Sequence, residues 1–114
     1  MTVKLKVLEL PVASTAITDS PVLRTAGSDL LLSMNFDDEG HIRATTLRFV
    51  KQRAFRKRSE IYCTGWHVTD AYDTVCEVAK SEWVQELRAA SSAASSAVWV
   101  MRHFIIYVDS FGCL

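Results

Sequence analysis

The 114-residue sequence lacks a net charge, a long apolar run and a recognisable targeting segment. Lysine plus arginine equals aspartate plus glutamate, 13 of each, so the chain has no overall electrostatic attraction to nucleic acid, membranes or acidic ligands. The longest apolar run, Phe104 to Val108, is far too short to cross a bilayer. Because the first residues enter a strand pattern directly, we expect a cytoplasmic protein that does not associate with membranes.

Paired cysteines are also missing. Cys63, Cys76 and Cys113 form no CxxC pair, and their odd number is typical of free thiols in a reducing compartment. A cysteine nucleophile needs a neighbouring base and a lowered thiol pKa. Cys63 and Cys76 fall in strand patterns, where buried and inert thiols are usual. Cys113 lies near a turn, and its partner cannot be identified from the sequence.

Motifs that would indicate an enzyme or a metal site are absent. The sequence contains no GxSxG, Walker-type loop, GxGxxG or paired-histidine metalloprotease motif. Cys63 and His67 would lie about 13 Å apart on one strand, too far to share an ion. We therefore expect no catalytic residue, no metal and no cofactor. An enzyme would require a pocket that holds Cys113 or His103 beside Asp109.

The strongest positive signal is a hairpin pattern between Asp29 and Val50. Two β-prone runs flank Asp37-Asp38-Glu39-Gly40, which suits a type I turn followed by a left-handed glycine, the three-residue hairpin loop. In the register that follows from this loop, two cross-strand pairs share one face, Phe36 with Ile42 and Met34 with Ala44. The hairpin predicts an antiparallel sheet as the scaffold.

Other segments also follow a strand pattern. Residues 3–7 alternate valine or leucine with lysine, which predicts a half-buried edge strand. Residues 59–69 and 72–78 alternate in the same way, and residues 98–109 form the most apolar run, expected to be a central strand covered on both faces. Residues 11–28 are small, polar or helix-breaking, and we interpret them as a long and mobile connection.

One helix is expected from Ser81 to about Ala94. Serine is a good N-cap, Glu82 suits the positive end of the helix dipole, and Trp83 and Leu87 recur at helical spacing.

These elements predict an α+β domain over residues 1–114, with a mostly antiparallel sheet of five to six strands and the helix packed on one face. Cys113-Leu114 resembles the start of a strand that is then cut off. Either the chain ends in a stub, or the natural protein continues beyond it.

The basic run from Lys51 to Arg58 carries five positive charges within eight residues. It suggests contact with nucleic acid or a phosphate-bearing ligand, with Phe55 available to stack on a base. The alternative is a solvated connection with one anchoring aromatic ring, which the balanced overall charge favours. The candidate ligand-binding residues are Lys51, Arg53, Phe55, Arg56, Lys57 and Arg58.

Four aromatic residues could instead line a pocket between the helix and the sheet, with Trp83 over Tyr72 or Trp99. Filling of the core is the alternative role for these rings. The candidate pocket residues are Trp66, Trp83, Trp99 and Tyr107.

We expect a non-enzymatic binding or interaction domain that acts through a sheet surface and self-associates as a homodimer. The basis is the apolar character of both faces of the hairpin and of residues 98–109. The alternative function is nucleic-acid or phosphate-ligand binding through residues 51–58.

Overall fold

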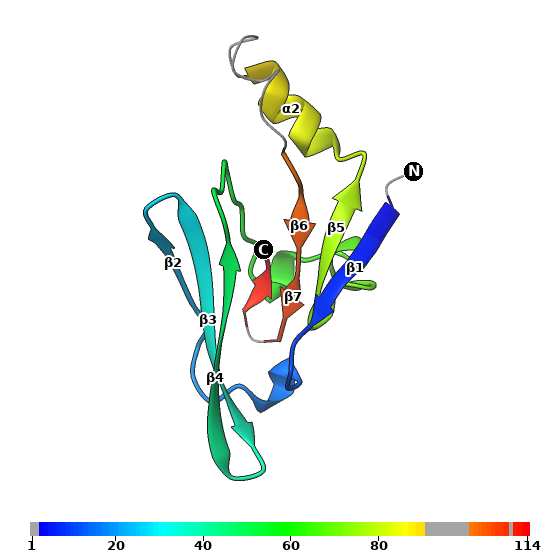
Figure 1. Cartoon of the computed structure of the whole chain (residues 1–114). Coiled ribbons are helices and arrows are strands. Elements are labelled where there is room, and N and C mark those ends of the chain that lie inside the picture. The colour runs from blue at the N-terminus through cyan, green and yellow to red at the C-terminus, as the bar shows by residue number, and fades with distance from the viewer. Residues whose placement is uncertain (1–2, 91–100, 110) are drawn as a thin grey trace.

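The computed structural model describes residues 3–90, 101–109 and 111–114. In chain order its elements are β1 (Val3–Glu9), η1 (Ser14–Ala16), β2 (Val22–Ala26), β3 (Asp29–Asp38), β4 (His41–Phe49), η2 (Glu60–Tyr62), α1 (Gly65–Val68), β5 (Thr74–Ala79), α2 (Glu82–Ala90), β6 (Phe104–Ile105), β7 (Tyr107–Val108) and β8 (Gly112–Cys113). The η elements are short 3-10 helices. This is the expected α+β class, with antiparallel strand ladders and one main helix (Figure 1).

The strands of the described residues form three small sheets, so the prediction of one sheet with five to six strands is wrong. One sheet has the order β1-β5-β6, the second has the order β2-β3-β4, and the third pairs β7 with β8. The apolar run divides at Ile106 because the backbone changes partners there. The N–H of Tyr107 donates to the carbonyl of Ala71 at 2.8 Å, and the N–H of Leu114 donates to the carbonyl of Ile106 at 3.0 Å. Residues 98–100 of the predicted strand lie outside the described residues.

The hairpin is formed by β3 and β4, but its predicted register is wrong by one residue. Glu39 and Gly40 have φ angles of 52° and 87°, as a two-residue turn of the type I′ family requires, so the loop is shorter than the predicted three-residue loop. Phe36 therefore faces Arg43, and Met34 faces Thr45. The predicted common face is lost, because Phe36 and Met34 are buried whereas Ile42 and Ala44 are exposed.

The main core lies between the β2-β3-β4 sheet and the strands β5 to β7. Phe36 and Leu32 on β3 and Val108 on β7 are fully buried. Burial of one such side chain contributes roughly 1.5–3 kcal/mol to folding. The cluster consists of Leu10, Leu32, Met34, Phe36, Leu47, Val75, Ile106, Val108 and Phe111.

Two segments differ from their predicted conformation. Residues 11–28, predicted to be a connection, contain β2, which pairs with β3 from Val22 opposite Ser33 to Ala26 opposite Asp29. Residues 59–69, predicted to be a strand, form η2 and α1 instead. Local hydrogen bonds replace a strand ladder there, because the Nδ1 atom of His67 accepts a bond from the backbone N–H of Thr64 at 2.9 Å.

The predicted strand at residues 3–7 is confirmed as β1, which lies at the edge of its sheet beside β5. Its apolar side chains are more exposed than we expected for a half-buried strand. The exposed fractions are 52% for Leu5, 47% for Val7 and 42% for Leu8. The register shifts between Lys6 and Leu8, which places a bulge in this edge.

The predicted helix start is confirmed. The hydroxyl oxygen of Ser81 accepts a hydrogen bond from the backbone N–H of Val84 at 3.3 Å, and α2 begins at Glu82. The helix is described to Ala90, so the predicted continuation to Ala94 lies outside the described residues. It does not cover a sheet face as expected, because none of its residues is fully buried and it stands at one end of the molecule beyond β5 and β6 (Figure 1).

Across the described ranges, no helix has the length and apolarity needed to span a membrane.

Candidate functional site

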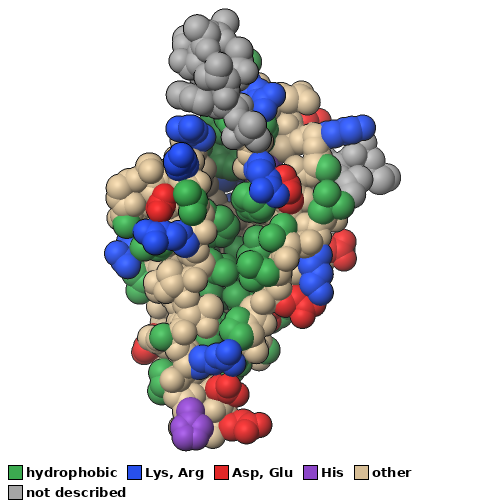
Figure 2. Space-filling model, viewed as in Figure 1, with side chains coloured by type: hydrophobic (Ala, Val, Ile, Leu, Met, Phe, Trp, Pro, Cys, Tyr) green, Lys and Arg blue, Asp and Glu red, His purple; other side chains and the backbone are tan. Residues whose placement is uncertain are grey.

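A cleft with a volume of about 580 Å³ opens between the two three-stranded sheets. The end of β4 and the segment 50–56 form one wall, residues of β1, β5 and β6 form the opposite wall, and α2 closes one end. Figure 2 shows hydrophobic side chains in this hollow, with lysine and arginine side chains around its upper rim. We call this feature the cationic cleft.

The floor of the cationic cleft is apolar. Phe49 ends β4 and Phe104 begins β6, and their ring centroids lie 6.3 Å apart across the gap between the sheets. The two sheets therefore place large apolar side chains opposite one another, and these side chains leave the cleft between the sheets open. The floor residues are Leu30, Leu47, Phe49, Phe104 and Ile106.

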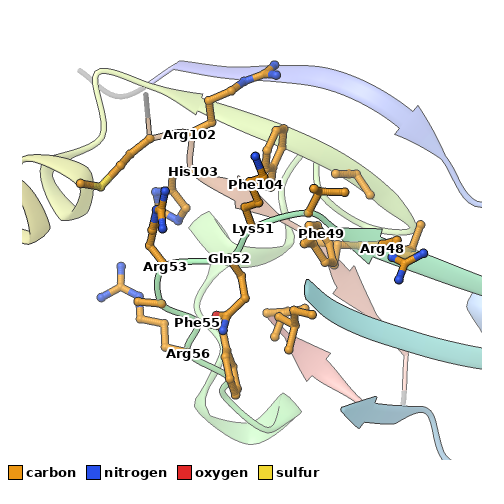
Figure 3. A pocket seen from close by; sticks show the side chains of 18 of the residues that line it. Arg48, Phe49, Lys51, Gln52, Arg53, Phe55, Arg56, Arg102, His103 and Phe104 are labelled. Carbon is orange, nitrogen blue, oxygen red and sulfur yellow. The ribbon is translucent and has the colours of Figure 1, made fainter. Parts of the chain in front are cut away.

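The charged side chains of the cleft all carry one sign. No aspartate or glutamate occurs among the described residues that line it. Figure 3 shows Arg53 and Arg56 at the end near α2 and Arg48 at the opposite end. The five cationic residues of the lining are Arg48, Lys51, Arg53, Arg56 and Arg102.

Two of these cations are neutralised by carboxylates behind the lining. The Nε atom of Arg48 lies 2.8 Å from a carboxylate oxygen of Asp29. Arg102 makes two bonds to Glu77, at 2.7 and 2.9 Å, and the pKa of Glu77 is lowered chiefly by this hydrogen bonding. Within the described part of the chain, Lys51 and Arg56 make no ion pair with a carboxylate. The cleft therefore has an excess of positive charge.

Arg56 is held in place by an aromatic contact with the helix. Its guanidinium carbon lies 4.2 Å from the centroid of the Trp83 ring, and Trp83 packs edge to face against His103 with ring centroids 5.1 Å apart. His103 is buried, and its Nδ1 atom lies 2.7 Å from the hydroxyl oxygen of Ser81. Burial, with a smaller contribution from Arg56, lowers the pKa of His103, so this ring is neutral at neutral pH.

Gln52 supplies an acceptor to the same wall. Its backbone N–H donates to the carbonyl of Ser28 at 2.7 Å, which fixes the backbone at this point. Its side-chain oxygen is buried and has no hydrogen-bond partner among the described residues. A buried acceptor without a hydrogen-bond partner lowers the stability of the folded state by about 1–3 kcal/mol. A ligand with a hydroxyl donor could remove that penalty.

The basic run of the sequence is divided between different surroundings. Lys51, Arg53, Phe55 and Arg56 line the cationic cleft. Lys57 lies outside it, with its ammonium nitrogen 4.5 Å from the centroid of the Phe111 ring.

Arg58 also lies outside the cleft. It donates to the carbonyl of Tyr62 at 3.3 Å, and its backbone pairs with Cys113. The run therefore does not form one continuous basic patch.

The three aromatic candidates that the structure describes, Trp66, Trp83 and Tyr107, are not brought together. Trp83 lines the cleft, but its ring neighbour is His103 and not Tyr72. Trp66 is 41% exposed, with the Lys4 ammonium 4.4 Å from its ring centroid, and Tyr107 packs on Tyr72 with centroids 5.4 Å apart. Neither of them is among the residues that line the cleft. Trp99 lies outside the described residues.

The condition set for an enzyme is met only in part. His103 lines the cleft, but Cys113 and Asp109 do not. The backbone N–H of Asp109 donates to the hydroxyl of Ser14 at 2.9 Å. The hydroxyl of Ser81, beside His103, already caps α2, and none of the described residues that line the cleft has a carboxylate to orient the imidazole. Within the described ranges, no group of three potential metal ligands occurs.

Sequence reasoning missed two features of this region. The first is that residues 51–56 and β6 line the same cleft as Trp83 of α2; the sequence places these segments far apart, so no residue spacing indicates that they meet. The second is the proximity of Cys63 to Cys113, which are separated by 50 positions in the chain.

Comparison with protein-family models, with curated proteins and with solved structures found no match.

Proposed function

We propose that this chain is a non-enzymatic binding domain, and that its cationic cleft holds a small amphipathic anion. The ligand has an apolar body and a phosphate or carboxylate head. The observation that carries the proposal is the combination of an apolar floor, five cationic side chains and no carboxylate among the described residues of the lining.

The apolar body and the anionic head of the ligand contribute separately to the free energy of binding. Apolar surface buried against Phe49 and Phe104 gains roughly 25 cal/mol per Å². The anionic head gains charge-assisted hydrogen bonds from Lys51 and Arg56, which make no ion pair with described carboxylates. A cleft volume of about 580 Å³ suits a ligand of this size.

Nucleic acid is the less favoured ligand. A strand or duplex needs an extended basic surface along which its phosphates lie. Here the cations of residues 51–56 converge on a hollow, while Lys57 and Arg58 contact Phe111 and Tyr62. The formal net charge of zero gives no wider attraction.

Isothermal titration calorimetry with decyl phosphate tests the proposal. Inorganic phosphate and 1-decanol carry the two halves of the probe separately, and we expect each to bind at least about tenfold more weakly than the whole. Arg56→Gln is expected to weaken decyl phosphate binding. Arg43→Gln is the matched control, because it removes one arginine whose side chain is 51% exposed and pairs with Asp38 at 3.6 Å in the hairpin, outside the cleft.

Two results would overturn the proposal. One is equal affinity for decyl phosphate and 1-decanol, which would mean that the cations do not recognise the head group. The other is binding of a single-stranded oligonucleotide that decyl phosphate does not displace.

A second function, homodimer formation, is supported by the exposed edge strand β1. Leu5, which does not line the cleft, exposes apolar surface beside backbone groups that have no partner strand on that side in the described structure. Val7 and Leu8 are also exposed, and they line the cationic cleft. Leu5→Glu is expected to weaken self-association in sedimentation equilibrium. A monomer at high protein concentration in the unsubstituted chain would end this proposal.

A further inference from the structure

Cys63 and Cys113 form the closest pair of thiols among the described residues. Their sulfur atoms lie 3.0 Å apart, and both are free thiols. A disulfide bond is about 2.05 Å long, so the sulfurs would move by only about 1 Å to become bonded. Cys76 has a different neighbour, the carbonyl oxygen of Asp70 at 3.2 Å.

Backbone pairing holds the two thiols together independently of any bond between them. Arg58 and Cys113 exchange two hydrogen bonds of 3.0 Å, each N–H donating to the other carbonyl. Gly112 has a φ of +105°, and a Cβ at this position would lie 2.0 Å from the carbonyl oxygen of Arg58. Close approach of the two segments therefore requires glycine at position 112.

The two cysteines differ in accessibility. Cys63 is partly exposed at the end of η2, and its thiol contacts the carbonyl of Ser59 at 3.5 Å. Cys113 is 7% exposed. Burial, followed by its hydrogen bond with Cys63, raises the pKa of Cys113 to about 11. An oxidant that enters from solvent therefore reaches Cys63 first.

We propose that Cys63 and Cys113 form a reversible intrachain disulfide when the protein meets a hydroperoxide. The Cys63 thiol loses its proton and its sulfur attacks the peroxide oxygen, so an S–O bond forms and the O–O bond breaks. The departing alkoxide or hydroxide takes up that proton as an alcohol or water, and Cys63 is left as a sulfenic acid. The sulfur of Cys113 then attacks the Cys63 sulfur. The S–S bond forms, the S–O bond breaks, and the departing hydroxide takes the Cys113 proton as water. A dithiol reductant reverses the modification by thiol–disulfide exchange.

The disulfide would connect the end of η2 to β8. Cys63 follows the basic run, and Cys113 precedes Leu114, which lines the cleft. A covalent link between these segments restricts the unfolded chain and makes opening of the η2 segment from β8 more difficult. This effect does not depend on the identity of any ligand.

Peptide mass spectrometry after titration with hydrogen peroxide tests the proposal. Before and after oxidation, the protein is unfolded in the presence of the alkylating reagent, digested and mapped. We expect the oxidised chain to be monomeric on a non-reducing gel, to contain a Cys63–Cys113 peptide, to lose two of its three alkylatable thiols under denaturing conditions, and to regain them with dithiothreitol. Its Tm is expected to rise by several degrees on oxidation.

Cys76→Ser is the control that keeps the pair, and it is expected to behave as the unsubstituted chain does. Cys63→Ser is expected to prevent both the linked peptide and the rise in Tm. Stable sulfinic acid at Cys63 without a linked peptide, a link that includes Cys76, or only intermolecular links would each overturn the proposal. Because the decisive mapping uses the unsubstituted chain, a folding defect in a variant does not affect the result.

Discussion

Arg56 lies over the indole ring of Trp83, with 4.2 Å between the guanidinium carbon and the ring centroid. This contact joins the basic segment after β4 to the first turn of α2, two parts of the chain that are far apart in sequence. It keeps a cation at the edge of an apolar hollow and leaves its hydrogen-bond donors available to a ligand.

Trp83→Leu is predicted to lower affinity for decyl phosphate by roughly two- to fivefold, because loss of a cation–π contact worth about 0.5–1 kcal/mol releases Arg56. Leucine keeps the wall apolar. The control is Trp66→Leu, which removes an indole that contacts Lys4 outside the cleft. A calorimetric titration that gives the same dissociation constant for Trp83→Leu as for the unsubstituted protein would show that the contact does not position Arg56.

Stability is predicted to fall as the pH decreases below 6.5, the ordinary pKa of histidine. Burial, followed by Arg56, lowers the pKa of His103 in the folded protein, so the unfolded state binds more protons in this range. The contribution of the neutral His103 ring to the free energy of unfolding is complete above the pKa of histidine in the unfolded state, and it is lost as the pH falls through the lower pKa of His103 in the folded state. Burial also lowers the pKa of His67, which adds to the same trend.

His103→Asn separates the contribution of His103 from that of His67. Asparagine can still hydrogen-bond to the hydroxyl of Ser81 but does not titrate. Urea unfolding at about pH 7.5 and about pH 5.5 is expected to give a smaller loss of unfolding free energy for His103→Asn than for the unsubstituted chain. The exposed substitution His41→Asn provides the comparison. An unchanged difference between the two pH values in His103→Asn would contradict the assignment.

Gly112→Ala is predicted to destabilise the fold more than Gly27→Ala. Both glycines have positive φ, so either substitution incurs left-handed strain of about 1–2 kcal/mol. Only at position 112 would the new Cβ also collide with a backbone atom, the carbonyl oxygen of Arg58. We expect Gly112→Ala to cost at least about 1 kcal/mol more than Gly27→Ala in chemical denaturation. Equal costs would mean that the two segments are not held in close contact.

Glu39→Asn is predicted to stabilise the β3–β4 hairpin by about 0.5–1 kcal/mol. Glu39 has a φ of 52°, and asparagine adopts this left-handed conformation with less strain than glutamate does. The substitution Glu39→Val should have the opposite effect, because a β-branched residue tolerates positive φ poorly. Thermal unfolding measures both. If asparagine and valine changed Tm in the same direction, the two-residue turn would be the wrong description.

The sequence predicted the elements whose signals are local. The acidic turn ending in Gly40 indicated the hairpin, and Ser81 marked the start of α2. The register was wrong because sequence does not distinguish one left-handed residue from two at positions 39 and 40. Residues 59–69 alternate as a strand does, but the hydrogen bond between Thr64 and His67 satisfies the backbone locally.

The candidate site was less predictable because it depends on contacts between distant segments. The basic run was visible, but its division into Arg56 facing the cleft and Lys57 facing Phe111 follows from how the chain turns after β4. The apolar run after residue 98 suggested one central strand. The strand is interrupted at Ile106 because the backbone there pairs with Ala71 and Leu114, and the alternation of apolar residues does not indicate such contacts between distant segments.

The most direct test of amphipathic anion binding is a proton–nitrogen NMR titration that follows the tryptophan indole signals. Decyl phosphate is predicted to shift the indole signal of Trp83, which lines the cleft, and to leave that of Trp66 in place, with 1-decanol at the same concentration causing a much smaller change. A shift at Trp66 without one at Trp83, or no shift at Trp83 at saturating decyl phosphate, would contradict the account.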